Sequence, residues 1–512
     1  MKNGQVVPHK TQADVAEVQL LPEGGGRVRF CFAANDSILV EVEGCDLRLR
    51  TAILTGHVAY RDSETRVTVN TRQSYRRFHV EALAGTVDLD APWKPDQCSS
   101  ITVTLRPNGG VARAAIEEFW STWTPRVRPD FDTAVKTVRD EFAAFAAGFG
   151  DSRPGIDTKT YTLAIYLMWA LTVQPSGILK RPAVLMSKHW MDQVWSWDHC
   201  FNAQALMGAH DQLAIDQWLV MFDHQDEFGA IPDALNDFVK HYNFCKPPVH
   251  GWTLARMLER CNPAILAPYL PQAYDHLSRW TNWWLTHRRA QGQILPHYLH
   301  GNDSGWDNST MFDDGVPLQG PDLAALLSVQ CQVLANLAPK VGRGAESAQW
   351  NTQATNLREA LIAQTWKNGR FQPQRLTPKG QIPVVCESLI PAITVFLGQD
   401  LPKEIQTVLI KDLERFVTGF GLATEWPSSP RYSTDGYWRG PSWAPSSYLA
   451  IDGLRRIGAN DLARRITEGF CAACEKSGFA ENFDALTGKG LRDPSYSWTA
   501  AVYLLLTRQN LE

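Results

Sequence analysis

Four short motifs in this chain place aromatic rings beside carboxylates, amides and hydroxyl groups. They are WSWDH at 195–199, HGNDSGWDNST at 300–310, YWRGPSW at 437–443 and FAENFD at 479–484. A tryptophan that only fills a core is expected among apolar residues, whereas these have polar neighbours. Sugars bind by stacking their C–H faces on aromatic rings and by hydrogen bonding their hydroxyl groups to polar side chains. The four motifs therefore indicate a carbohydrate-binding site.

Two carboxyl groups in these motifs could cleave an acetal. That chemistry needs one protonated carboxyl group to release the leaving oxygen and one ionised carboxylate to activate water or attack carbon. Asp307 follows Trp306 after a glycine turn, and the neighbouring indole would desolvate it and raise its pKa, as an acid requires. Glu481 lies just beyond a predicted helix that ends near Gly478, which makes it the candidate base.

Other carboxylates remain open as alternatives. Asp303 is a rival for the acid, and Glu425 and Asp484 are rivals for the base. Asp303 and Asp484 fit an Asx turn or a helix cap equally well, because a short carboxylate readily accepts hydrogen bonds from nearby backbone N–H groups.

Other reaction classes fit the sequence poorly. It contains no P-loop, no GxGxxG after a strand, no GxSxG and no HExxH. The acidic run from Asp303 to Asp314 lacks the register of a calcium loop, and His297 and His300 have no third ligand at a suitable spacing. The pair Cys471 and Cys474 lies within a helical run, where packing explains it. We therefore expect no metal and no organic cofactor.

The composition limits the partners. The 512 residues include 50 basic and 54 acidic side chains, for a net charge of −4, and no polybasic run occurs, so we expect neither a nucleic-acid nor a membrane partner. The first residues lack the apolar stretch of a signal peptide, and no segment approaches the ~18 apolar residues of a membrane span. Ten cysteines without a framework spacing suggest reduced thiols and a cytoplasmic location. The oligomeric state is left open.

The surrounding elements fall into two patterns. Residues 1–115 form short β-rich runs, several of them alternating, with turn residues between them, which predicts an antiparallel β-sandwich domain. Residues 116–150 are predicted to form a linker and a connecting helix. From 151 to 512 helical periodicity dominates, so this segment is the expected catalytic domain.

Twelve helical segments are expected after residue 150, and short connections pair several of them into antiparallel hairpins. Six hairpins are the number in an (α/α)6 toroid, and no repeat of ~34 or ~40 residues favours a solenoid instead. Long connections between the segments hold most residues of the four motifs, as expected of loops that carry a site. The segments are 157–173, 198–209, 211–226, 248–260, 266–288, 321–338, 345–368, 385–397, 402–417, 440–457, 459–477 and 496–508.

With these motifs, the chain resembles glycoside hydrolase family 63 and, more loosely, the trehalases of family 37. The compact bacterial members that hydrolyse mannosylglycerate and glucosylglycerate are the most similar. The resemblance covers roughly 130–512 and rests on the order and spacing of WSWD at 195–198, GNDSGWDN at 301–308, GYWRGP at 436–441 with Trp443, and Glu481 ahead of YSW at 496–498.

The resemblance implies an (α/α)6 barrel that hydrolyses α-glycosides with inversion, with Asp307 as general acid and Glu481 as general base. Trp197 and Asp198 are similar to the wall and hydroxyl clamp of the sugar subsite. The full set of residues that we expect to contact substrate is Trp195, Trp197, Asp198, Gln225, Asn302, Asp303, Trp306, Tyr437, Trp438, Gly440 and Trp443.

Two departures from the family bear on the substrate. The small glycerate-glycoside hydrolases lack so long an N-terminal extension, whereas larger α-glucosidases of the family carry an N-terminal β-sandwich. No Arg/Gln pair for a glycerate carboxylate is visible near Glu481, where Tyr496 and Ser497 stand. The expectation is therefore an inverting, exo-acting α-glucosidase for a short α-glucoside. A hydrolase of glucosylglycerate or mannosylglycerate, a non-catalytic sugar-binding protein of the same fold, and an inverting phosphorylase are the alternatives.

Overall fold

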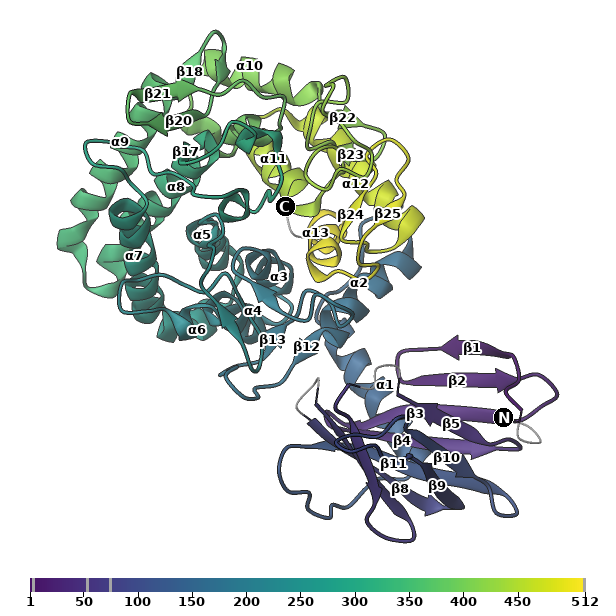
Figure 1. Cartoon of the computed structure of the whole chain (residues 1–512). Helices are drawn as coiled ribbons and strands as arrows, with labels where there is room; N and C mark the ends of the chain where they lie inside the picture. The colour runs from purple at the N-terminus through teal and green to yellow at the C-terminus, as the bar shows by residue number, and fades with distance from the viewer. Residues whose placement is uncertain (2–4, 52–54, 73–75, 510–512) are drawn as a thin grey trace. The chain divides into compact units, whose positions relative to one another are not determined.

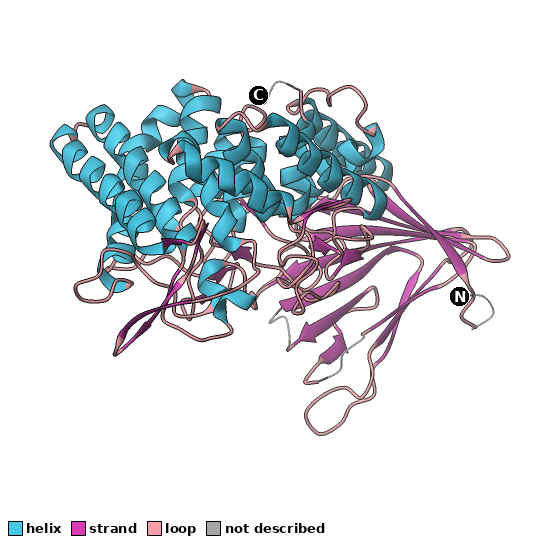
Figure 2. Cartoon of the chain, turned by 90° about the horizontal axis from the view of Figure 1, so that it is seen from above, coloured by secondary structure: helices cyan, strands magenta, loops and turns pink. Residues whose placement is uncertain are grey.

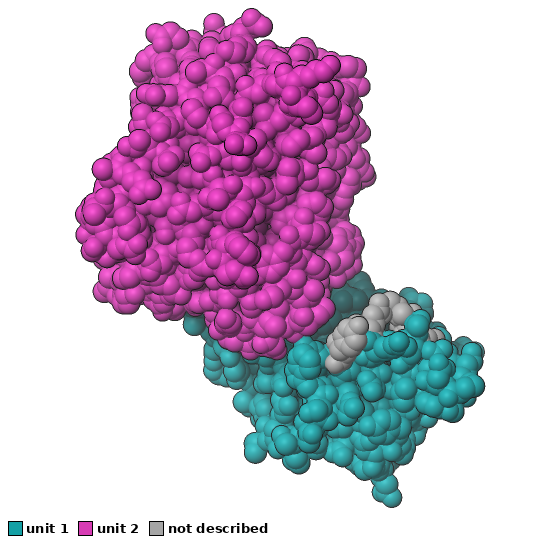
Figure 3. Space-filling view, turned by 60° about the vertical axis from the view of Figure 1, so that its left-hand side comes forward, with its two compact units in different colours: residues 1–145 teal, residues 146–512 magenta. Residues whose placement is uncertain are grey.

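The computed structural model describes residues 1, 5–51, 55–72 and 76–509. The chain forms two compact units, residues 1–145 and 146–512, which Figure 3 colours separately. The boundary between them falls inside the segment 116–150 that the sequence marks as a linker with a connecting helix.

The first unit is a β-sandwich, as predicted. An eight-stranded antiparallel sheet has the order β1-β2-β3-β4-β11-β8-β7-β6, and a second sheet has the order β5-β10-β9. Valine and leucine side chains from both sheets, such as Val42, Val87 and Val103, share one core. The strands are β1 His9–Ala13, β2 Glu17–Pro22, β3 Arg27–Ala34, β4 Ser37–Glu43, β5 Leu47–Arg50, β6 Val58–Arg61, β7 Arg66–Thr71, β8 Arg76–Ala84, β9 Thr86–Asp90, β10 Thr102–Arg106 and β11 Val111–Phe119.

Helix α1 (Phe131–Ala147) begins on the other face of the large sheet. In β4, alternate residues point to opposite faces, so Val40 joins the inter-sheet core while Leu39 contacts Phe131 and Val135 at the start of α1. The large sheet is thus covered on both faces along β4.

The second unit is built mainly of helices. Its helices are α2 Thr158–Ala170, α3 Asp198–Leu206, α4 Asp211–Leu219, α5 His250–Arg260, α6 Pro263–Leu266, α7 Leu270–His287, α8 Pro321–Leu337, α9 Ser347–Thr365, the 3-10 helix η7 Ile390–Asp400, α10 Lys403–Glu414, α11 Ala444–Arg456, α12 Asn460–Ser477 and α13 Ser497–Thr507. Shorter 3-10 segments are η1 Phe222–His224, η2 Ala267–Tyr269, η3 Gly301–Ser304, η4 Thr310–Phe312, η5 Ala338–Val341 and η6 Gly344–Glu346.

Six of these helices close an inner ring. Around the ring, α3 contacts α5, α5 contacts α8, α8 contacts η7, η7 contacts α11, α11 contacts α13, and α13 returns to α3. The outer helices α2, α4, α7, α9, α10 and α12 alternate with them along the chain, and Figure 1 shows the two rings. Inner helices such as α13 are buried along their whole length, as helices that are apolar all round must be. The predicted (α/α)6 toroid is confirmed.

Two predicted helices differ in detail. The segment 266–288 is divided among the end of α6, η2 and α7, where Pro268 and Pro271 each lack the backbone N–H that a continuous helix would use. The segment 385–397 begins only at Ile390 and forms a 3-10 helix, because Ser388 instead pairs with Glu425 in an isolated bridge.

The connections that enter the inner helices are the long ones, and they form short sheets. β14 pairs with β15, which links the α2–α3 and α4–α5 connections, while bridges join Ala423, Ser442 and Phe483. Figure 2 shows these hairpins and loops mainly at one end of the barrel helices. The strands are β12 Thr172–Val173, β13 Ala183–Val184, β14 Val194–Trp195, β15 Ala234–Leu235, β16 Lys240–His241, β17 Leu318–Gln319, β18 Trp366–Lys367, β19 Arg370–Phe371, β20 Gln374–Thr377, β21 Gly380–Pro383, β22 Val417–Thr418, β23 Gly421–Leu422, β24 Asn482–Phe483 and β25 Gly490–Leu491.

All ten cysteines are buried and free of disulfide bonds, and Cys471 and Cys474 lie in α12 as expected. Within the described ranges, none of the helices combines the length and apolar character that crossing a bilayer requires.

Candidate active site

The connection between α7 and α8 holds Asp307 by close backbone packing. A Cβ atom added at Gly301 would lie 2.1 Å from the Asp307 carbonyl oxygen. Gly305 has a φ of +75°, and a Cβ atom there would lie 2.5 Å from the Trp197 ring. Glycine is required at both positions so that the Asp307 loop can fold tightly against Trp197.

Asn308 joins this loop to the connection between α10 and α11. Its side-chain amide donates to the Gly436 carbonyl oxygen at 3.0 Å, and its side-chain oxygen accepts from the Trp438 backbone N–H at 2.9 Å. The two bonds lie on either side of Tyr437 in the sequence. Asn308 therefore fixes Tyr437 relative to the adjacent Asp307.

Tyr437 adopts a left-handed backbone conformation, with a φ of +63°. Such a conformation costs of order ~1–3 kcal/mol in a non-glycine residue and persists only when its surroundings enforce it. The indole N–H of Trp443 donates to the Tyr437 carbonyl oxygen at 2.9 Å. The strained backbone directs the Tyr437 hydroxyl group toward both candidate catalytic carboxyl groups, with which it interacts.

Glu481 is held by backbone bonds from the last connection, between α12 and α13. Its N–H donates to the Asp493 carbonyl oxygen at 2.7 Å, and its carbonyl oxygen accepts from the indole N–H of Trp498 at 3.3 Å. Phe483 and Ser442 exchange backbone hydrogen bonds, which ties this loop to the one carrying Tyr437. The Glu481 side chain is itself only 4% exposed.

Tryptophan rings from three of the four motifs meet around Trp438. Its ring centroid lies 3.9 Å from that of Trp443, with planes 7° apart, and 4.8 Å from that of Trp306. Trp197 lies 6.1 Å from it by the same measure, and Trp498 from α13 packs edge-on against both Trp197 and Trp443. The predicted sugar-binding tryptophans other than Trp195 therefore form one aromatic cluster next to the carboxyl groups.

Burial raises the pKa of Glu481, Asp307 and Asp198. It raises the pKa of Glu481 to about 7, although the Tyr437 hydroxyl group and Arg492 act to lower it. It also raises the pKa of Asp307, against the positive charge of Lys246, and the pKa of Asp198 well above its usual range. Carboxyl groups with raised pKa values can carry or accept a proton near neutral pH, as acid–base catalysis requires.

Lys246, in the connection between α4 and α5, was not found from the sequence. Its ammonium group is buried, lies 3.1 Å from Asp233 Oδ1 and donates to the Asn302 carbonyl oxygen at 3.0 Å. Burial alone would lower the pKa of Lys246, but the attraction of Asp233, Asp307 and Asp198 outweighs burial and raises it. Lys246 is thus a positive charge at the site. The sequence signal was weak, because Lys246 stands in a Cys-Lys-Pro-Pro stretch with no acidic residue beside it.

Arg492 is a second cation that the sequence did not reveal. Its guanidinium group lies 5.4 Å from the centroid of the Tyr437 ring, pairs with Asp435 and lowers the pKa of Glu481. Its φ is +65°, so its backbone also is held in the left-handed region. Near it, the carboxylate of the buried Asp493 accepts from the Ser187 hydroxyl group at 2.6 Å.

Two predicted substrate contacts have protein partners. Asp303 is 1% exposed; it pairs with Arg288 at 2.7 Å and accepts backbone N–H groups from Cys245 and Leu299. The Gln225 amide donates to the carbonyl oxygens of Gly229 and His276 and accepts from the His276 ring. Both side chains support loops, and their contact with substrate stays a prediction.

The rival bases also have partners. Glu425 is fully buried and accepts from the hydroxyl groups of Thr310 and Ser429 at 2.6 and 2.7 Å. Asp484 accepts from the Leu486 backbone N–H and the Thr487 hydroxyl group, which is the Asx turn that the sequence left open. Both groups are engaged in shaping the loops.

Three further residues predicted to contact substrate shape the site mainly through their backbone. The carbonyl oxygen of Trp195 accepts from the His199 ring at 3.0 Å, and that of Asn302 accepts from Lys246. Gly440 has a φ of +154°, and a Cβ atom there would lie 2.1 Å from the Ser433 carbonyl oxygen. Gly440 therefore permits the tight turn that follows Tyr437 and Trp438.

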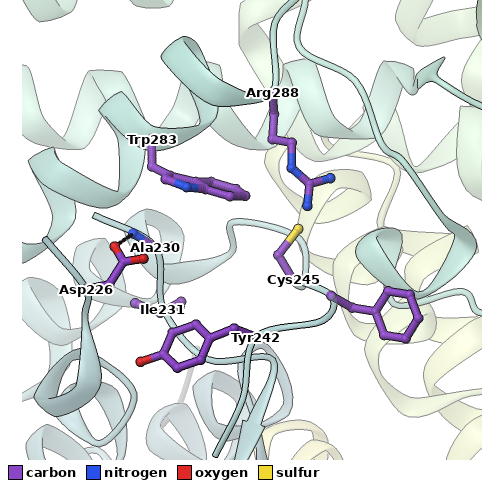
Figure 4. Close-up of a pocket in the computed structure, with 8 residues that line it drawn as sticks. Asp226, Ala230, Ile231, Tyr242, Cys245, Trp283 and Arg288 are labelled. Carbon is purple, nitrogen blue, oxygen red and sulfur yellow. Dashed lines mark hydrogen bonds between the residues drawn. The ribbon is translucent and has the colours of Figure 1, made fainter. Parts of the chain in front are cut away.

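A pocket of about 330 Å³ lies beside this constellation. Figure 4 shows the guanidinium group of Arg288 and the sulfur of Cys245 directed toward one another, near the rings of Trp283 and Tyr242. Two of its lining residues connect it to the site, because Cys245 precedes Lys246 in the sequence and Arg288 pairs with Asp303. Its lining residues are Asp226, Ala230, Ile231, Tyr242, Phe244, Cys245, Trp283 and Arg288.

The sequence model of the family described as mannosylglycerate hydrolase MGH1-like glycoside hydrolase domain matches residues 191–499, which include all four motifs. The chain belongs to this family. It is a glycoside hydrolase of family 63 type, as the sequence motifs predicted.

Two named relatives each align with about two thirds of this chain and with nearly all of their own length. A mannosylglycerate hydrolase of Rubrobacter radiotolerans is 23% identical over 419 residues, covering 64% of this chain and 93% of the relative. A glucosylglycerate hydrolase of Mycolicibacterium hassiacum is 24% identical over 447 residues, covering 67% of this chain and 97% of the relative. The structure of the family 63 mannosylglycerate hydrolase of Thermus thermophilus in complex with glucose has a TM-score of 0.60 at 19% identity, covering 67% of this chain and 99% of that one.

Replacing Asn308 with alanine tests whether the link between the two loops positions Tyr437. We expect kcat for glycoside hydrolysis to fall by roughly 10²-fold with little change in the melting temperature, because small displacements of catalytic groups have effects of this size. Asn356→Ala on the exposed surface of α9 is the matched control and should behave as wild type. A wild-type kcat for Asn308→Ala would show that the link does not matter.

Proposed function

We propose that this chain is an inverting, exo-acting hydrolase of a small α-glycoside whose aglycone carries a carboxylate, as in glucosylglycerate or mannosylglycerate. The observation that carries the catalytic part is that Asp307 and Glu481, from different connections of the barrel, both interact with the hydroxyl group of Tyr437. Two carboxyl groups that share one hydroxyl partner suit a reaction in which an acid and a base act together.

In the proposed reaction, Asp307 gives its proton to the glycosidic oxygen as the C–O bond breaks. Glu481 accepts a proton from a water molecule, and that water attacks the anomeric carbon from the opposite ring face. The product sugar then has the inverted anomeric configuration. Asp198 binds hydroxyl groups of the sugar, and the tryptophan cluster around Trp438 forms the wall of the sugar subsite.

Two cations support an acidic aglycone. The two cations act on different members of the carboxyl pair: the charge of Lys246 acts on Asp307 and the charge of Arg492 acts on Glu481. Arg492 is the better candidate for a direct contact, because its side chain is 32% exposed and its present partner Asp435 is 60% exposed. An exposed ion pair of this kind is weak and can exchange one carboxylate for another.

The relatives support the same choice. They are named for mannosylglycerate and glucosylglycerate, which favours the alternative that the sequence left open over a neutral α-glucoside. The sequence-based preference for a neutral substrate followed from the missing Arg/Gln pair near Tyr496. Arg492 stands a few residues earlier in the same connection and offers the charge from a different position.

A substrate panel followed by proton NMR tests the proposal. Glucosylglycerate and mannosylglycerate should be hydrolysed with a kcat/KM at least about 10-fold above that of neutral α-linked disaccharides, because a charge-assisted hydrogen bond contributes roughly 1.5–3 kcal/mol. The first product resonance should be the β-anomer. Initial release of the α-anomer would disprove inversion, and faster hydrolysis of trehalose or maltose would disprove the acidic aglycone.

The variant Arg492→Gln, assayed on the same substrate panel, tests whether Arg492 contacts the carboxylate of the aglycone. Because Arg492 also lowers the pKa of Glu481, both substrate classes are compared at a pH where Glu481 is ionised in wild type and variant. There the variant should lower kcat/KM for the glycerate glycosides by roughly 10–100-fold and leave that for neutral disaccharides nearly unchanged, since only the former lose a charge-assisted contact. Asp435→Asn, which removes the exposed partner, is the control and should not weaken the acidic substrates. Equal losses for both substrate classes would remove Arg492 from the specificity argument.

Glycosyl fluorides separate the acid from the base. Fluoride leaves without protonation, so Asp307→Asn should retain substantial turnover of the matching α-glycosyl fluoride while losing hydrolysis of the natural glycoside. Glu481→Gln should lose both, because water still requires a base. The reverse pattern would exchange the two roles, and full activity of either variant on the glycoside would exclude that residue.

The pH dependence should reflect the raised pKa of Glu481, about 7. A base must be ionised, so kcat/KM should fall as the pH decreases below about 7 instead of below the usual range of a glutamate. The Tyr437 hydroxyl group lowers the pKa of Glu481, so Tyr437→Phe should move this acidic limb to higher pH. An acidic limb at pH 4–5, or a shift of that limb to lower pH in Tyr437→Phe, would contradict the assignment. Since Asp307 and Glu481 both interact with Tyr437, the apparent pKa values of the pH profile describe the two carboxyl groups together.

A further inference from the structure

Three side chains of types that can bind a metal meet in the core of the barrel, and none of them takes part in the proposed proton transfers. They are His199 and Cys200 in the first turn of α3 and His250 at the start of α5. Their potential ligand atoms all lie within 4.8 Å of one another, and none of the three side chains is exposed to solvent. Among the described residues, this is the group of histidine, cysteine and acidic side chains that lies close enough together to share one ion.

His199 is prepared for such a role by its hydrogen bonds. Its Nδ1 donates to the Trp195 carbonyl oxygen at 3.0 Å, so its Nε2 carries the lone pair, and this nitrogen lies 3.6 Å from the Cys200 sulfur. Metal-bound histidines commonly donate their other ring N–H to a backbone carbonyl in this way. With Zn–N bonds of ~2.0–2.1 Å and a Zn–S bond of ~2.3 Å, tetrahedral geometry puts nitrogen and sulfur ~3.6 Å apart.

His250 is otherwise unexplained. Within the described part of the chain, neither of its ring nitrogens has a hydrogen-bond partner, although the side chain is fully buried. Its ring centroid lies 5.1 Å from that of His199, and the rings of Phe222 and Trp280 pack edge-on against it. A buried polar group without a partner costs roughly 1–3 kcal/mol, which a metal bond would offset.

The surroundings also suit the charge of a bound ion. The Thr253 hydroxyl group accepts from the Gln204 amide at 3.2 Å and interacts with the Cys200 sulfur, so it can donate its own hydrogen to a thiolate. Burial raises the pKa of the Cys200 thiol, so the thiol keeps its proton unless a cation replaces it. A divalent ion with one thiolate and two neutral imidazoles leaves one positive charge, beside the carboxylate of Asp198.

We propose that His199, Cys200 and His250 bind one zinc ion that joins the starts of α3 and α5. On binding, the Cys200 thiol releases its proton to solvent, and the two imidazoles bind as neutral ligands. The ion fixes two segments of the site relative to each other, because α3 begins with Asp198 and Lys246 lies shortly before His250. This site lies outside the sequence-based expectation that no metal is present.

Metal analysis of the untagged full chain tests this inference directly. Protein expressed with added zinc and purified without chelators should contain close to one zinc per chain, and X-ray absorption should show one sulfur at ~2.3 Å and nitrogens at ~2.0–2.1 Å. Folded, active protein with less than ~0.1 equivalent of zinc after dialysis against micromolar Zn²⁺ would overturn the inference, since structural zinc binds far more tightly. A zinc shell without sulfur would overturn it too.

Variants place the metal at these residues. Cys200→Ser and His250→Ala should each lose the bound zinc and the rise in melting temperature that zinc gives metal-free wild type. Cys471→Ala, which removes another buried thiol from α12, should keep both. Full zinc content in folded Cys200→Ser or His250→Ala would place the ion elsewhere and refute the site. Because the metal content of the wild type is decisive, the test does not depend on the stability of either variant.

Discussion

The buried ammonium group of Lys246 is the interaction on which this site depends most. Asp198 begins α3, Asp233 lies in the connection between α4 and α5, and Asp307 lies in that between α7 and α8. The charges of all three act on Lys246. Three carboxylates brought this close would repel one another and be driven to protonate, and the ion pair with Asp233 at 3.1 Å is what offsets that repulsion. Lys246 also donates to the Asn302 carbonyl oxygen, so the same group fixes the loop that carries Asp307. Charge balance and loop position are therefore set together.

The ring of inner helices makes this arrangement possible because it brings all six long connections to the inner-helix N-termini. Each connection is irregular, and its backbone polar groups need partners from the neighbouring loops. Asn308 bonding to both sides of Tyr437, and Ser442 exchanging bonds with Phe483, are examples. The strained φ of +63° at Tyr437 is maintained by such bonds. The site is rigid because its loops hold one another, whereas the helices mainly set where the loops begin.

The sequence predicted the frame well because helix periodicity and alternating strands are local signals. The sandwich, the toroid and most of the twelve helical segments are confirmed by the structure, and the Asp307 and Glu481 motifs stood out through their aromatic residues. Lys246 and Arg492 were missed because an isolated cation in a loop has no periodic or compositional signal. The sequence predicts Asp303 and Gln225 as substrate contacts, but only the fold reveals that Arg288 and His276 bind them. Long-range partners of polar groups were what the sequence could not provide.

The electrostatics of the site connect the substrate to the acid. In the free enzyme, Lys246 lowers the pKa of Asp307 against the effect of burial, which opposes the protonated state that a general acid needs. The negative charge of Asp233 acts in the opposite direction and raises the pKa of Asp307. Under the proposed function, the carboxylate of the aglycone brings a second negative charge close to the leaving oxygen. Like the charge of Asp233, it would raise the pKa of Asp307 by electrostatic repulsion. An acidic aglycone would thus promote protonation of Asp307 as it binds. A neutral disaccharide supplies no such charge, so Lys246 would keep the pKa of Asp307 lower and make the acid less effective toward the neutral substrate.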